Sequence, residues 1–124
     1  MSNKLKIIVL EDEFERRKWF NNIFFSDNIT FTITSKKTIQ CLESEKYDLI
    51  FLDRDICDLK DSGEKVALEM MKRKIQLNST IVIHTMNPNG QEAMKNYLDK
   101  THKNVYVIPY TELIKMKRKD FNQR

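Results

Sequence analysis

Runs of apolar residues and helix-like stripes alternate along the chain from one end to the other. KIIVL and DLIFL contain the continuous apolar runs IIVL and LIFL, as expected of strands that are buried on both faces. Segments such as GEKVALEMMKRKI instead repeat apolar residues with the period of an amphipathic helix. The expected strands are 6–10, 29–33, 48–52, 80–83 and 105–108, and the expected helices are 13–26, 35–44, 63–75, 87–100 and 111–121.

This alternation predicts an α/β fold in which a parallel sheet lies between two layers of helices. The second expected strand, ITFTI, alternates apolar and polar residues, which is typical of a strand at a sheet edge. We therefore predict a doubly wound (βα)₅ three-layer sandwich with strand order 2-1-3-4-5, formed by residues 1–124 as one domain. Ser35 and Asn87 are the expected N-caps of their helices, with Pro88 at the first helical position.

Acidic residues follow the first and the third expected strands. Glu11 and Asp12 come after KIIVL, and Asp53, Arg54 and Asp55 come after DLIFL. In a doubly wound sheet, ligands bind beyond the carboxyl ends of the strands where the strand order reverses, which here is between strands 1 and 3. We therefore expect the two acidic clusters to face each other in one crevice.

Clustered carboxylates repel one another unless their pKa values rise or a cation neutralises them. Oxygen ligands of this kind suit Mg²⁺ (or Mn²⁺). We predict that Asp12 and Asp53 bind the ion. Glu11 is expected in the outer shell, and Asp55 is expected to contribute its backbone carbonyl or its side chain. Alternatively, Asp12 caps the first helix, because Asp12-x-x-Glu15 fits a capping box.

The stretches KIIVLEDE and YDLIFLD resemble the receiver domain of two-component response regulators, which is flavodoxin-like in fold. The resemblance implies that Glu11, Asp12 and Asp53 bind Mg²⁺ and that Asp53 takes a phosphoryl group from a histidine kinase. Receivers also carry a lysine at the end of the fifth strand. This chain has Ile108 there, before Pro109.

A narrower family, the cyclic-phosphate processing receivers, resembles the chain at three further places. LDRDI is similar to its LDHDL-like stretch, Ser62-Gly63 to its turn into the next helix, and IHTMNPNGQEAM to its His-Ser/Thr-x-Asn-Pro-x-Gly segment. The resemblance implies a metal-assisted site that acts on cyclic phosphates of RNA ends or nucleotides. Arg54 stands where that family often has histidine.

Opening a cyclic phosphodiester requires an activated water, stabilisation of the developing negative charge and a proton for the leaving oxygen. A metal ion at Asp53 could serve the first two needs, and His84, on the neighbouring strand end, the third. Arg54 is expected to clamp phosphate oxygens, and Thr85 to donate to phosphate. Asn87 either helps to bind phosphate at a helix N-terminus or caps that helix. The predicted catalytic residues are thus Asp53, His84, Arg54 and Thr85.

Each of these residues also has a structural interpretation. His84 is then a neutral imidazole that is hydrogen-bonded at a strand end, and Thr85 is an ordinary strand residue. Arg54 is then an ion-pair partner that holds Asp53 and Asp55 apart. With this interpretation the chain is an atypical response-regulator receiver, which signals by binding or by phosphorylation at Asp53 without catalysis of its own.

Composition narrows the choice of partners. The formal net charge is +4, and much of the excess lies in segment 115–124. Short charge runs are usually solvated, so we expect no DNA binding there, although an adaptor that meets an acidic partner through KMKRK is an alternative. Cys41 and Cys57 lie at no zinc-ligand spacing from each other or from the histidines.

The sequence also lacks the marks of a membrane or secreted protein. No apolar run reaches the roughly 20 residues that cross a bilayer. The first apolar run is short and is followed at once by acidic residues, unlike a signal peptide. We expect a cytoplasmic protein whose partner is a nucleotide or RNA end with a cyclic phosphate, or a signalling protein.

Overall fold

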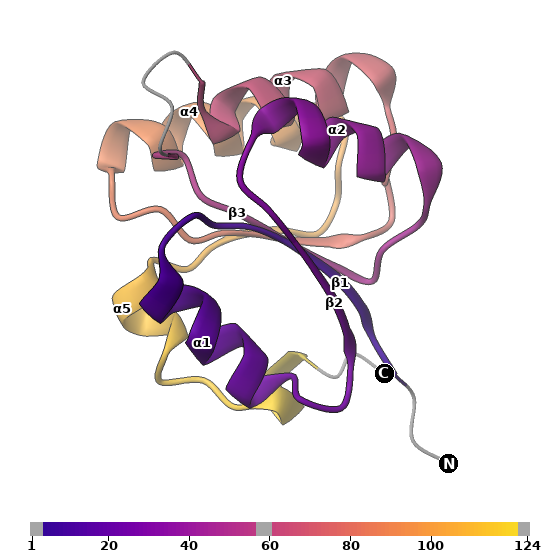
Figure 1. The fold of residues 1–124 in the computed structure, drawn as a ribbon. Coiled ribbons are helices and arrows are strands. Elements are labelled where there is room, and N and C mark those ends of the chain that lie inside the picture. The colour runs from indigo at the N-terminus through magenta and orange to yellow at the C-terminus, as the bar shows by residue number, and fades with distance from the viewer. Residues whose placement is uncertain (1–3, 57–60, 122–124) are drawn as a thin grey trace.

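The computed structural model describes residues 4–56 and 61–121, so Cys57 lies outside the described residues. Five strands form one parallel sheet in the order β2-β1-β3-β4-β5 (Figure 1). The predicted strand order is therefore confirmed, as is the edge position of the second strand. The strands are β1 (Lys6–Leu10), β2 (Asn28–Thr32), β3 (Leu49–Leu52), β4 (Thr80–Ile83) and β5 (Val105–Val107).

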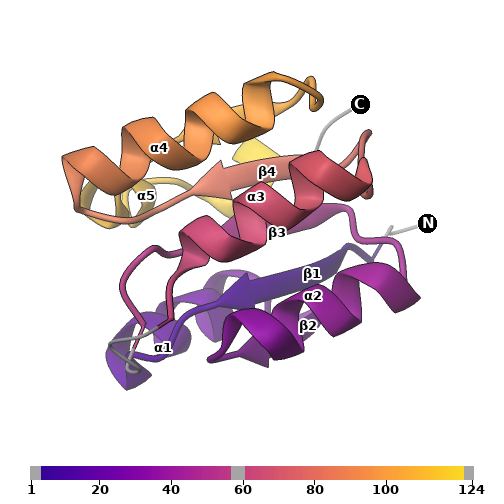
Figure 2. The same cartoon turned by 90° about the horizontal axis from the view of Figure 1, so that it is seen from above.

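Helices cover both faces of this sheet, which confirms the predicted three layers. The helices α2, α3 and α4 lie on one face, and α1 and α5 lie on the other (Figures 1 and 2). Within the described part of the chain, every helix is too short or too polar to cross a membrane. The bounds are α1 (Phe14–Ile23), α2 (Ser35–Ser44), α3 (Gly63–Arg73), α4 (Pro88–Asp99), α5 (Tyr110–Leu113) and a 3₁₀ turn, η1 (Arg118–Phe121).

The central strand β3 is buried on both faces, which explains its unbroken apolar sequence. Ile50 and Leu52 belong to the core beneath α2, α3 and α4, whereas Leu49 and Phe51 belong to the core beneath α1 and α5. Each such side chain stabilises the fold by roughly 1.5–3 kcal/mol through burial. The strand therefore lies between two cores, and Asp53 is the first residue after its apolar run.

The N-terminus of α4 follows the sequence prediction. Asn87 is the N-cap, and its Oδ1 accepts hydrogen bonds from the backbone N–H groups of Asn89 at 2.9 Å and Gly90 at 3.1 Å. Pro88 is the first helical residue, where its missing N–H is not needed. The cap fixes where the chain turns away from the end of β4.

The predicted N-cap of α2 is wrong by one residue. Thr34 is the cap, and its Oγ1 accepts a hydrogen bond from the N–H of Lys37 at 3.2 Å. Ser35 is already helical, and its N–H and hydroxyl both donate to Asp61, at 2.8 and 2.5 Å. The reason for the error is this tertiary contact, since Asp61 lies in the distant loop before α3.

The predicted helix 111–121 is also wrong, because the chain forms only the short helix α5 and the separate turn η1. Two side chains explain the break. Asp120 Oδ2 accepts a hydrogen bond from the backbone N–H of Lys117 at 2.8 Å, which starts a new turn. The Arg118 side chain donates to Asp27 through Nε at 3.1 Å and through Nη2 at 2.8 Å. The other element boundaries lie within three residues of the predicted ones.

This pairing ties the C-terminal segment to the start of β2 and yields the first testable prediction. Burial tends to raise the pKa of Asp27, but hydrogen bonds from Arg118 and the Leu5 N–H outweigh it and hold that pKa below its usual value. Replacing Asp27 with Asn should lower the free energy of unfolding by about 1–3 kcal/mol at neutral pH.

The sign of the pH dependence follows from the lowered pKa. The stabilisation by Asp27 is complete above the pKa of the unfolded chain and is lost as pH falls through the lower pKa of the folded chain. Urea unfolding of the wild type and Asp27→Asn should therefore show a difference that shrinks below about pH 4. Lys119→Gln is the control, and a difference that is independent of pH would contradict the prediction.

Candidate functional site

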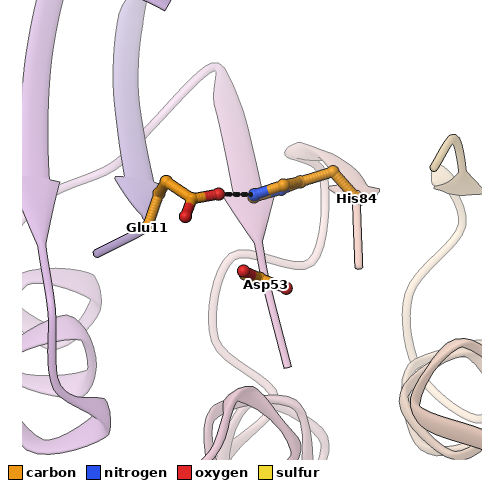
Figure 3. A group of neighbouring side chains, drawn as sticks. All are labelled: Glu11, Asp53 and His84. Atoms are coloured by element: carbon orange, nitrogen blue, oxygen red, sulfur yellow. Dashed lines mark hydrogen bonds and ion pairs between the residues drawn. The ribbon is translucent and has the colours of Figure 1, made fainter. Parts of the chain in front are cut away.

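Glu11, Asp53 and His84 come together at the carboxyl ends of three adjacent strands (Figure 3). The last residues of β1, β3 and β4 are in register, so the residues that follow them lie side by side. One carboxylate oxygen of each acid and one ring nitrogen of His84 lie within 4.8 Å of one another. This cluster lies where the strand order reverses, as the sequence predicts.

Glu11 and His84 form a fully buried pair. Nε2 of His84 lies 2.8 Å from Oε1 of Glu11, and both residues are 0% exposed. The imidazole packs edge-on against the rings of Phe20 and Phe51, with centroid distances of 5.5 and 6.4 Å. The second Glu11 oxygen accepts the N–H of Glu13 at 3.0 Å. These contacts hold the Glu11 carboxylate in one orientation, while Nδ1 of His84 is buried without a hydrogen-bond partner among the described residues.

Asp53 is nearly buried, with 4% of its surface exposed. Its Oδ1 accepts a hydrogen bond from the N–H of Arg54 at 2.8 Å. Burial raises the pKa of Asp53 and the nearby Glu11 adds to the rise, whereas His84 and Arg16 oppose it. The carboxylate is therefore in an environment that favours its neutralisation by a proton or a cation.

Arg16, which lies in α1 and reaches both acids, is a site residue that the sequence motifs did not indicate. Its Nη1 is 3.7 Å from Oδ2 of Asp53 and 3.9 Å from Oε1 of Glu11. Its guanidinium carbon lies 4.7 Å from the centre of the Tyr110 ring, in a cation–π contact. Its position in the first turn of α1, shortly after the acidic residues that follow β1, could have identified it.

Arg54, the predicted phosphate clamp, turns toward other partners. Its Nε donates to Glu64 at 2.5 Å and its Nη1 donates to Asp55 at 3.0 Å. The ion-pair interpretation is thus correct for Asp55, but the second partner is Glu64 rather than Asp53. A phosphate-binding role for Arg54 stays a prediction.

Thr85 and Asn87 form the loop between β4 and α4. Thr85 is fully buried just beyond β4, and its Oγ1 accepts the N–H of Asn87 at 3.2 Å. Its backbone carbonyl accepts a hydrogen bond from Nε2 of Gln91 at 2.9 Å. The capping interpretation of Asn87 is confirmed, and phosphate binding by either residue stays a prediction.

The remaining predicted ligands, Asp12 and Asp55, are less buried than the cluster. Asp12 is half-buried and is not one of the three side chains whose ligand atoms lie together. The capping alternative for Asp12 is wrong, because Glu13 is the N-cap of α1 and makes no side-chain cap hydrogen bond. Asp55 is exposed and holds Arg54. Glu11, expected in an outer shell, instead lies within the cluster, and metal binding by Asp12 and Asp55 stays a prediction.

Gly63 allows α3 to begin directly against the end of β3. A Cβ atom at this position would lie 1.9 Å from the backbone oxygen of Asp53. The N–H of Gly63 donates to the carbonyl of Arg54 at 3.0 Å, and Ser62 caps the helix by accepting the N–H of Glu64 at 3.2 Å. The close approach fixes the backbone from which the Asp53 side chain projects.

Comparison with known proteins agrees with this geometry. The family described as "Cyclic-phosphate processing Receiver domain" matches residues 6–100. No curated protein matches the chain.

Similar solved structures are response-regulator receivers. A CheY-like receiver domain from Methanospirillum hungatei has a TM-score of 0.69 at 13% identity, over 97% of this chain and 95% of that chain. TrrA from Thermotoga maritima, solved with Mg²⁺ and BeF, has a TM-score of 0.62 at 23% identity, over 82% and 83%. The Mn²⁺-bound response regulator Rcp1 has a TM-score of 0.65 at 18% identity, over 90% and 88%. At these identities the structures show the shared fold.

The contact at Gly63 leads to a prediction with an internal control. Replacing Gly63 with Ala should lower the free energy of unfolding by about 1–3 kcal/mol, because the new Cβ meets backbone atoms that cannot rotate away. Gly90→Ala is the matched comparison, since its Cβ would meet Cδ of the Arg54 side chain at 2.3 Å, and a side chain can shift more readily than backbone. That change should cost less than Gly63→Ala. Urea unfolding measures both, and equal losses would contradict the argument.

Proposed function

Because the chain belongs to the cyclic-phosphate processing receiver family, we propose that it is a metal-assisted phosphoesterase that acts on cyclic phosphates of RNA ends or nucleotides. The observation that carries the proposal is the group formed by Glu11, Asp53 and His84, whose ligand atoms lie within 4.8 Å of one another. Two acids and an imidazole at a strand-order reversal are the components of a phosphate-processing site.

The donor set fits a divalent cation. Oxygen atoms from Glu11 and Asp53 suit Mg²⁺, and the neighbouring imidazole nitrogen also suits Mn²⁺. In this proposal these two acids hold the ion, and Asp12, which adjoins Glu11, supplies a further oxygen. When bound, the ion supplies positive charge for the phosphate and an activated water. TrrA and Rcp1, which share the fold, were solved with Mg²⁺ and Mn²⁺.

The chain's own residues have three tasks in this proposal. His84 holds the Glu11 carboxylate in place through the 2.8 Å contact at Nε2, and proton donation by His84 to the leaving oxygen stays a prediction. Asp53, whose Oδ1 accepts the backbone N–H of Arg54, holds the ion beside the reacting phosphate. Thr85 and Asn87 bind phosphate oxygens at the start of α4.

A second candidate is an atypical receiver that signals by binding a protein partner, with Asp53 phosphorylated or silent. The observation that favours it is the complete burial of His84 against Phe20 and Phe51, which separates the imidazole from a bulky nucleotide. Ile108 packs in the core beneath α1 and α5, in the place where receivers carry a lysine.

Hydrolysis of 2′,3′-cyclic nucleotides and cyclic dinucleotides with Mg²⁺ or Mn²⁺ tests the first candidate. Asp53→Asn should reduce the rate on the order of 100-fold or more, because it removes one of the two carboxylates that hold the ion. Asp99→Asn is the control, because Asp99 is exposed on α4 and pairs with Lys95. Equal rates for the wild type and Asp53→Asn on every substrate would contradict the enzymatic proposal.

Acetyl phosphate with Mg²⁺, followed by intact-mass measurement, tests the second candidate. A phosphorylating receiver should gain one phosphoryl group, and the gain should disappear in Asp53→Asn because the acceptor carboxylate is gone. Wild-type protein that hydrolyses cyclic phosphates and gains no mass would exclude phosphorylation at Asp53.

A further inference from the structure

We propose that Arg16 is the phosphate-binding cation of this site and that it competes with the metal ion for the same two carboxylates. The inference rests on the proposed function only in assuming that the site takes a divalent cation and a phosphate group. It assigns a role to a residue that the sequence motifs do not include.

Arg16 is attracted to the acids but is not bound tightly to them. Its Nη1 lies 3.7 Å from Asp53 and 3.9 Å from Glu11, longer than a good hydrogen bond. Its side chain is 21% exposed, so the guanidinium lies between the buried acids and solvent. A ligand that approaches the cluster from solvent therefore meets the donors of Arg16.

Tyr110 holds the guanidinium plane beside the site. The Arg16 carbon lies 4.7 Å from the ring centre, and the Tyr110 N–H donates to the backbone carbonyl of His84 at 3.0 Å. The Trp19 ring packs edge-on against Tyr110 at 6.3 Å. Stacking on an aromatic face orients the guanidinium but leaves its N–H groups available in the plane, where they match two phosphate oxygens.

Arg54, the arginine in the sequence motif, is less suited to this role. Its Nε and Nη1 already donate to Glu64 at 2.5 Å and Asp55 at 3.0 Å. Phosphate would have to break these hydrogen bonds before Arg54 could clamp it. Among the residues that the structure describes, the acidic neighbours of Arg16 lie no closer to its guanidinium than 3.7 Å.

The positive charge of Arg16 should affect the binding of the metal ion and the binding of phosphate in opposite directions. Without a metal ion, the guanidinium partly neutralises Glu11 and Asp53, so a divalent cation must overcome its repulsion. Once that cation neutralises the acids, the attraction on Arg16 weakens and its donors can turn to phosphate. The same residue should therefore weaken binding of the metal and strengthen binding of the anion.

Arg16→Gln separates these two effects. The variant should bind Mn²⁺ more tightly than the wild type, by roughly threefold or more, because a positive charge beside the ion is removed. With saturating Mn²⁺, it should bind inorganic phosphate roughly tenfold more weakly, because a charged donor pair is lost. Titration calorimetry with Mn²⁺ alone, and then with phosphate, gives both values.

Two further variants provide controls. Arg17→Gln removes the same charge from the same helix, and its side chain makes no ion pair with Glu11 or Asp53 in the described part of the chain; it should change both affinities less than Arg16→Gln. Arg16→Lys should restore the wild-type Mn²⁺ affinity but only part of the phosphate affinity, because lysine lacks the planar fork.

The outcomes also separate this inference from the proposed function. If Arg16→Gln weakens Mn²⁺ and phosphate binding together, or matches Arg17→Gln in both, Arg16 is only structural and the inference is overturned. If the opposite shifts occur but no cyclic phosphate is hydrolysed, the inference stands and the enzymatic proposal fails. A wild type that takes up no Mn²⁺ overturns both.

Discussion

Two carboxylates stand at the ends of strands that are buried on both faces, and the surrounding structure is organised to keep them there. Glu11 is completely buried and Asp53 nearly so, and their oxygen atoms lie within 4.8 Å of each other. Like charges this close are unfavourable in a region of low polarity, so each needs a compensating group. His84 supplies it for Glu11 through a 2.8 Å contact, and Arg16 supplies a positive charge to both acids.

The parallel sheet makes this arrangement possible. Because β1, β3 and β4 run in register, the residues that follow them emerge at one edge without any connection between them in sequence. The helices then close the site from two sides. Gly63 allows α3 to pack against the backbone of Asp53. Arg16 of α1 lies beside the carboxylates and stacks on the ring of Tyr110. The site thus depends on both helical layers as well as on the sheet.

The burial of His84 affects both candidate functions. An imidazole enclosed by Phe20 and Phe51 and directed at Glu11 acts on a ligand through that acid rather than by direct contact. Its first effect is therefore to orient a carboxylate, which matters equally to a metal-assisted esterase and to a receiver that binds a phosphoryl group. Arg16, at the border with solvent, is the positively charged group that an incoming anion meets.

The amino-acid sequence alone determined the architecture and the position of the acidic cluster. Apolar runs with no polar alternation predicted strands buried on both faces, and acids after the first and third runs predicted that Glu11 and Asp53 lie together, because both follow from local patterns and general topology. The resemblance to cyclic-phosphate processing receivers was confirmed over residues 6–100.

Only the tertiary structure decided which charged groups pair. Arg54 pairs with Glu64, and Arg16 lies beside Asp53. Arg118 donates to Asp27, 91 residues away in sequence, and this contact interrupts the expected last helix. Long charged side chains choose among partners by distance and burial in the folded chain, and neither quantity is visible in the spacing of residues along the sequence.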